Sequence, residues 1–182
     1  MIMPPHLRKF ALTVHVTSSV GLVGAVAGFL ALAIAGLTGR DAQIARAVYP
    51  AMNIIAESVI VPLAFASLIL GIVKSLGTPW GLFRQYWVLA KLLLTLLTVI
   101  VLLFQMDSIG LLAGIAAQRT LSSAEIGLQV RVVIHAAGGL LVLLVATTLS
   151  VYKPRGMTRY GARKQVEQGP AAPTADAAIP VA

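Results

Sequence analysis

The chain has 182 residues, of which 58% are hydrophobic and 11% charged, and its formal net charge is +8. This composition is too apolar for an ordinary soluble domain with a wet surface. The absence of cysteine excludes disulfides, thiolate metal sites and cysteine nucleophiles. The basic residues flank apolar runs, so the expected partner is a bilayer with anionic headgroups and not nucleic acid.

Four apolar runs predict four membrane-spanning helices, over residues 10–37, 48–73, 86–105 and 131–152. Each run is close to the ~20 residues that a helix needs to cross a bilayer. The predicted fold class is therefore all-α, an integral membrane four-helix bundle that forms one domain over residues 1–164.

The first run follows Arg8 and Lys9, as the apolar region of a secretory signal would. A signal's apolar region has roughly 7 to 15 residues, and the run over 10–37 is longer, so an uncleaved span is the favoured interpretation. Gly24 and Gly28 stand at GxxxG spacing. This spacing predicts that a neighbouring helix approaches closely there.

The second run contains Glu57, an acidic residue that has no simple surface explanation. It lies eight residues past Tyr49, roughly 12 Å below the outer boundary, so its carboxylate cannot reach the headgroups. Asn53 is one turn earlier on the same face and can donate a hydrogen bond to it. Together with His135 and Arg131 of the fourth run, they predict a polar intramembrane site. That site is either a locked hydrogen bond or a proton-handling or ligand-binding group.

Breaker residues in 74–85 predict an inner loop before the third run. Lys91 lies about one and a half turns into that run, and its stem is expected to snorkel to the inner headgroups. The sequence also predicts outer loops near 38–47 and 106–130. Within the second of these, 109–117 is apolar but too short to cross, so we interpret it as a helix on the membrane surface.

Ser122 and Glu125 have the spacing of a capping box and predict a helix start before the fourth run. Past its end, a basic stretch is expected to contact inner headgroups. The stretch contains Lys153, Arg155, Arg159, Arg163 and Lys164. Residues 165–182 are rich in Ala and Pro and predict a disordered cytoplasmic tail.

The distribution of Lys and Arg predicts the orientation. With a cytoplasmic N-terminus, four of the 14 basic residues fall outside, namely Arg40, Arg46, Arg119 and Arg131, and the other ten fall inside. Four spans then place both termini in the cytoplasm. The expected localisation is the cell inner membrane, as a multi-pass protein.

His15 and His135 are the candidate ligands for haem or copper, because bundled helices can supply axial imidazoles. They lie near opposite borders, however, and should differ in depth by roughly 18 to 20 Å in a hydrocarbon core of ~30 Å. They cannot hold one ion together. Familiar enzyme motifs are missing from the sequence, so no catalytic residue and no cofactor is predicted.

Two segments resemble a group of small bacterial four-span membrane proteins of unknown function. They are WGLFRQYWVLAKLLLT at 80–95 and RVVIHAAGGLLVLLVATTLSVYKPRGMTRY at 131–160, about a quarter of the chain. This resemblance implies an inner-membrane location and a helical bundle. The segment LTVHVTSSVGLVGA at 12–25 more faintly resembles the first helix of copper-resistance and haem-related membrane proteins.

Three functions follow as hypotheses. The leading one is a non-enzymatic accessory or structural membrane protein that acts through a partner or as a homo-oligomer. The second is a transporter-like or proton-handling module built on Glu57 and His135, with Asn53 and Arg131 in support. The third is a haem or copper redox subunit that uses His15 or His135.

Overall fold

A computed structural model describes residues 4–39, 41–76 and 85–152, together with Gly156, Thr158 and Arg163. These residues are helical apart from short turns, which confirms the predicted all-α class. The elements are α1 (Pro5–Thr38), α2 (Ala42–Ile55), the π-helix η1 (Ala56–Ile60), α3 (Val61–Leu76), α4 (Tyr86–Gln118), the 3-10 helix η2 (Ser123–Glu125) and α5 (Ile126–Tyr152). The predicted tail at 165–182 lies outside the described residues.

Four helices are long and apolar enough to cross a membrane. Their bounds are His6–Thr38, Ala42–Leu76, Tyr86–Gln118 and Ser123–Tyr152. The second is a single rod made of α2, η1 and α3, called here the second rod. Among the described residues, the predicted number of apolar helices of spanning length is therefore confirmed.

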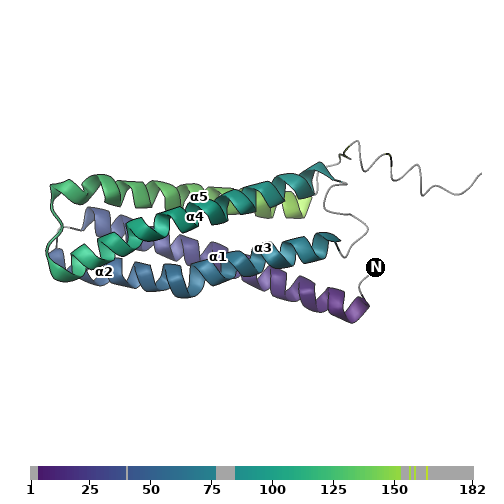
Figure 1. Ribbon diagram of the computed structural model, residues 1–182, viewed down its shortest axis with the longest axis horizontal. Helices are drawn as coiled ribbons and strands as arrows, with labels where there is room; N and C mark the ends of the chain where they lie inside the picture. The colour runs from purple at the N-terminus through teal and green to yellow at the C-terminus, as the bar shows by residue number, and fades with distance from the viewer. Residues whose placement is uncertain are drawn as a thin grey trace, which may run out of the picture.

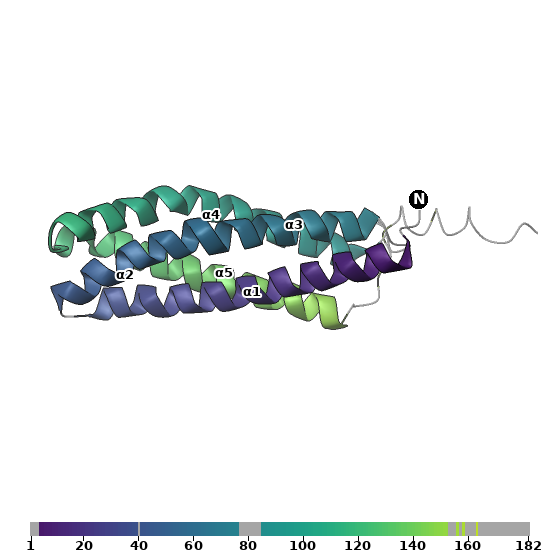
Figure 2. The ribbon, with the colours of Figure 1, turned by 90° about the horizontal axis from the view of Figure 1, so that it is seen from below.

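The four rods lie antiparallel and form an elongated bundle (Figures 1 and 2). One end of the bundle, called here the N-terminal end, contains the starts of α1 and α4 and the ends of α3 and α5 (Figure 1). Both α1 and α4 pack against the second rod and against α5. The bundle is therefore a square in which α1 lies diagonal to α4, and the second rod lies diagonal to α5.

The second rod is longer than the predicted 48–73, because the Asp41 side chain caps it by accepting from the backbone N of Gln43 at 2.8 Å. Its π-helical turn has a cause in the sequence. Pro62 follows the turn and has no N–H to donate, and its ring would clash with the carbonyl of Ser58 in a regular α-helix. Ser58 lies inside η1, so the wider turn relieves that clash.

The predicted outer loops are both too long. The α1–α2 turn occupies only the few residues between Thr38 and Ala42, and α4 continues through the expected loop to Gln118. The segment 109–117 is therefore not a surface helix but part of α4, with Ile109 and Leu112 buried in the core. A single exposed carboxylate, Asp107, does not end a helix whose apolar face continues beyond it.

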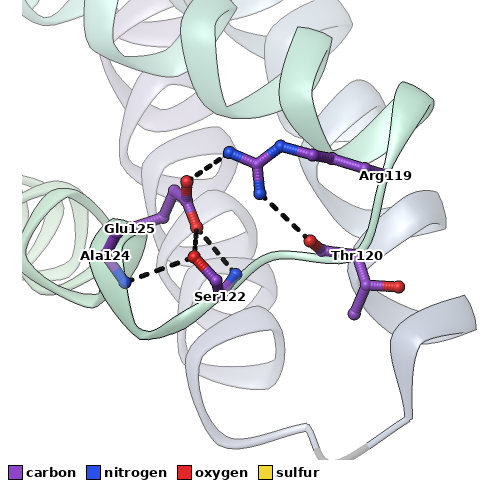
Figure 3. A network of polar contacts seen from close by, with 5 residues as sticks. All are labelled: Arg119, Thr120, Ser122, Ala124 and Glu125. Carbon is purple, nitrogen blue, oxygen red and sulfur yellow. Dashed lines mark hydrogen bonds and ion pairs between the residues drawn. The ribbon is translucent and has the colours of Figure 1, made fainter.

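The true α4–α5 turn is short and is held by a polar network (Figure 3). The Arg119 guanidinium pairs with Glu125 Oε1 at 2.5 Å. The backbone N and the Oγ of Ser122 each donate to Glu125 Oε2 at 2.7 Å. The backbone N of Ala124 donates to Ser122 Oγ at 3.3 Å. The predicted capping box is present, and Arg119 extends it to the end of α4.

Within this chain, no neighbouring helix makes the predicted close approach at Gly24 and Gly28, because a Cβ built at either glycine has nothing within 4 Å. The close approach is instead at Gly36, where a Cβ would lie 2.8 Å from Tyr49 Cζ and 2.9 Å from its Oη. Tyr49 is 2% exposed, so its ring has little freedom to move away. Gly36 is therefore the glycine that lets α1 and α2 pack closely.

Replacing Gly36 by Ala should lower stability, because the added methyl overlaps a buried ring that cannot shift. Overpacking of this kind costs about 1–3 kcal/mol, and thermal unfolding followed by circular dichroism in detergent would measure it. Gly24→Ala is the matched control on the same helix and should be neutral or slightly stabilising. Equal losses in both variants would contradict the assigned packing.

Candidate functional site

A cavity of about 500 Å³ lies between α1, α3 and α4 at the N-terminal end of the bundle. Its volume is within the range of roughly 300–1,000 Å³ typical of ligand pockets. The polar residues that line it are Arg8, His15, Ser67, Lys74, Ser75, Lys91 and Thr95. We call this cavity the cationic pocket, because three of these side chains are basic.

Helical spacing explains why these side chains gather. Arg8 and His15 are seven residues apart on α1, and Ser67 and Lys74 are seven apart on α3, so each pair shares one face. Lys91 lies about one and a half turns into α4 from its start at Tyr86. Because α3 runs toward the N-terminal end and α1 and α4 start there, the basic residues of the pocket lie at a similar height along the bundle axis.

His15 is 5% exposed and lies against the backbone of α3. A Cβ at Gly71 would come within 3.4 Å of His15 Cε1, so the glycine makes room for the ring. Within the described part of the chain, His15 Nδ1 is buried and has no hydrogen-bond partner. A buried polar atom without a partner is uncommon in proteins.

Lys91 does not simply extend to the membrane border. Its Nζ donates to Ser150 Oγ at 2.6 Å, and Ser150 Oγ donates in turn to the Ala146 carbonyl at 2.8 Å. The ammonium is thereby held between α4 and α5 while its side chain lines the cationic pocket. Two of the three protons on the ammonium can still be donated to a further acceptor.

Among the described residues, no carboxylate lines the cationic pocket. The acidic residues within the described ranges are Asp41, Glu57, Asp107 and Glu125. Asp41 and Glu125 lie in the turns at the opposite end of the bundle, and the other two lie in η1 and in the second half of α4. Concentrated positive charge of this kind favours an anion and opposes a metal cation beside His15.

The predicted hydrogen bond between Asn53 and Glu57 is present, with Asn53 Nδ2 donating to Glu57 Oε1 at 3.1 Å. Glu57 is exposed on the outside of the rod. Asn53 Oδ1 is instead buried, and it has no hydrogen-bond partner in the described residues. It lies near α4, because a Cβ built on Gly110 would be 3.7 Å from it. The pair therefore joins the lipid-facing side of the rod to its contact with α4.

His135 and Arg131 form a separate pair on α5, in which His135 Nδ1 lies 2.7 Å from the Arg131 carbonyl oxygen. Because α5 is diagonal to the second rod, the structure does not bring His135 and Arg131 together with Glu57 and Asn53. The predicted four-residue polar site is thus divided into two local pairs.

The two candidate haem or copper ligands lie in different cavities. His15 lines the cationic pocket, and His135 lines a second, apolar cavity. Over the ranges that the structure describes, no group of three or more His, Asp or Glu side chains could hold a metal ion.

Most of the predicted headgroup contacts after α5, namely Lys153, Arg155, Arg159 and Lys164, lie outside the described residues. Arg163 is described and exposed.

The convergence of His15, Lys74 and Lys91 was not predicted from the sequence. Lys74 was assigned to the inner loop and Lys91 to snorkelling, and His15 was considered only as a haem or copper ligand. The signal that could have found them is positional, because all three lie within a few turns of the same predicted border.

No family model, no curated protein and no solved structure matches the chain. The geometry of the described residues therefore carries the functional argument.

Since Glu57 and His135 lie on diagonal rods, substitutions at the two positions should act independently. In a double-mutant cycle with Glu57→Gln and His135→Leu, we expect unfolding free energies to add within about 0.5 kcal/mol. Thermal or denaturant unfolding in detergent would measure the cycle. A coupling well above that value would contradict the separation and revive a shared polar site.

Proposed function

We propose that this chain is a non-enzymatic accessory protein of the bacterial inner membrane, multi-pass and with both termini in the cytoplasm. We further propose that it binds an anionic headgroup in the cationic pocket. The observation that carries this proposal is the gathering of Arg8, Lys74, Lys91 and His15 around one cavity.

The orientation supports this ligand class. Under the positive-inside rule the N-terminal end of the bundle faces the cytoplasm. The cationic pocket then lies at the level of the inner leaflet, where anionic lipids concentrate and attract basic side chains. A phosphate or carboxylate could therefore enter from the leaflet without crossing the bilayer.

The hydrogen bonds around the pocket favour recognition by charge. The hydroxyls of Ser75 and Thr95 donate to carbonyls of their own helices, at 2.8 Å each. Ser67 is paired with Ser19, at 2.8 Å between the two Oγ atoms. Charged donors such as Arg8 and Lys91 are then the main groups that a ligand could engage. Charge-assisted hydrogen bonds to phosphate are stronger than neutral ones, so the site suits a class of anionic headgroups more than one specific metabolite.

Removing the charge of a pocket residue should weaken binding of an anionic lipid. We expect Lys91→Met and Arg8→Gln each to lower the affinity for phosphatidylglycerol by a factor of roughly 10 to 150, since such bonds contribute about 1.5–3 kcal/mol. Titration of the purified protein in zwitterionic nanodiscs, followed by native mass spectrometry, would measure the change.

Lys9→Gln is the control for this experiment, because Lys9 is the neighbour of Arg8 on α1 but does not line the cavity. Its affinity should match that of the unmodified protein. A uniform decrease in all three variants would indicate diffuse attraction to the surface and would overturn the assignment of the pocket.

Reporter fusions test the proposed orientation. A reporter placed after Gly39 or after Ser122 should be external, and one placed at Thr78 should be cytoplasmic, because each position lies in the chain between two successive predicted spans. The opposite pattern would invert the bundle and place the cationic pocket at the outer leaflet.

A further inference from the structure

A second cavity, of about 330 Å³, lies in the middle of the bundle and is lined by all four rods. Most of its lining is apolar, and we call it the lipid-facing pocket. Leu97 of α4 and Ile134 of α5 line it while remaining 54% and 62% exposed. The cavity therefore opens sideways between α4 and α5, toward the space that lipid tails occupy around a spanning bundle.

One residue that lines this apolar space carries an unpaired hydrogen-bond donor. Gln105 lines the lipid-facing pocket, and its Nε2 is buried with no partner in the described part of the chain. An amide N–H that is removed from water and left unpaired is costly. An occupant that carries a hydrogen-bond acceptor would satisfy it, whereas an acyl chain or a hydrocarbon side chain would not.

His135 provides a second polar group at the same cavity. Its Nδ1 lies 2.7 Å from the Arg131 carbonyl oxygen, and a carbonyl can only accept, so Nδ1 carries a proton. In the neutral ring the other nitrogen is then an acceptor. The mostly apolar wall of the cavity thus includes Gln105, which has an unpaired amide donor, and His135, whose second ring nitrogen can accept.

Depth narrows the chemistry of the occupant. The middle of α4 (Tyr86–Gln118) is at Leu102, so Gln105 lies three residues beyond it, or about 4.5 Å along the axis. The edge of a ~30 Å hydrocarbon core is about 15 Å from its centre. The ester carbonyls of bilayer phospholipids lie near that edge, so the acceptor at Gln105 must belong to a molecule that dissolves in the core.

We propose that the lipid-facing pocket binds a lipid-soluble carbonyl compound of the quinone type, whose carbonyl oxygen accepts a hydrogen bond from Gln105 Nε2. Two adjacent glycines of α5 leave space for a ring, since a Cβ at Gly138 or Gly139 has nothing within 4 Å. The pocket shares no lining residue with the cationic pocket. This proposal therefore stands or falls independently of anionic headgroup binding.

The test is a titration of the purified protein with decyl-benzoquinone, in nanodiscs, by equilibrium dialysis. Binding should be saturable, and decylbenzene, which has the same tail and no acceptor, should bind at least ten-fold more weakly. The infrared carbonyl band of the bound quinone should shift to lower frequency because of the hydrogen bond. In Gln105→Leu we expect the shift to disappear and the affinity to fall about ten-fold.

Gly139→Leu tests the cavity without removing the donor, because Gly139 lines the cavity and the new side chain would occupy part of it. It should abolish saturable binding. Gly114→Leu is the matched control: a Cβ there also has nothing within 4 Å, but Gly114 does not line the pocket. This variant should bind normally.

Several results would overturn the proposal. Equal binding of decylbenzene and decyl-benzoquinone would show that the pocket takes an acyl chain and that Gln105 does not select its occupant. Uptake that does not saturate and is unchanged by Gly139→Leu would show partitioning into the bilayer. An unshifted carbonyl band in the unmodified protein would show that the bound quinone accepts no hydrogen bond. That result would hold even if Gln105→Leu failed to fold.

Discussion

Backbone hydrogen bonding away from water is the constraint on which this structure depends. Hydrocarbon offers no partners to N–H and C=O groups, so a chain this apolar must satisfy them within helices. Hydroxyl side chains follow the same rule: Thr98, Thr147 and Thr148 each donate to a carbonyl one turn earlier on their own helix. Against that background, the few buried polar atoms that have no partner in the described residues become informative. They are His15 Nδ1, Tyr49 Oη, Asn53 Oδ1 and Gln105 Nε2.

Hydropathy and capping were enough to predict the helical class, the number of apolar helices and the Ser122–Glu125 cap, because these depend on residues close together in the chain. Helix lengths were harder. The run that ends near 105 was separated from 109–117 by polar Gln105 and Asp107, yet one face of α4 stays apolar through both. A composition window averages over faces and cannot detect that continuity, so it placed a loop where the helix continues.

The candidate sites depend on which rods are neighbours. A single apolar run in the sequence holds no information about its neighbours in the bundle. In the square bundle, Glu57 and His135 lie on diagonal rods, so two residues of similar predicted depth do not meet. His15 and Lys91 also lie on diagonal rods, α1 and α4, but the cavity between them is lined by both. Two residues must therefore share a depth to form a site, but a shared depth is not enough. Whether they meet also depends on how the rods are arranged around the bundle axis.

The π-helical turn shows how a local irregularity sets the faces of the second rod. Met52, Ala56, Ile60 and Ala64 are all buried and stand four residues apart. On a regular α-helix of about 100° per residue, a four-residue repeat drifts by about 40° at each step. The wider turn of η1 offsets part of that drift, so Ile60 and Ala64 stay on the core side while Glu57 faces outward. Ala56 and Ile60 also line the lipid-facing pocket, so the turn imposed by Pro62 shapes part of the wall of this cavity and links a backbone requirement to its form.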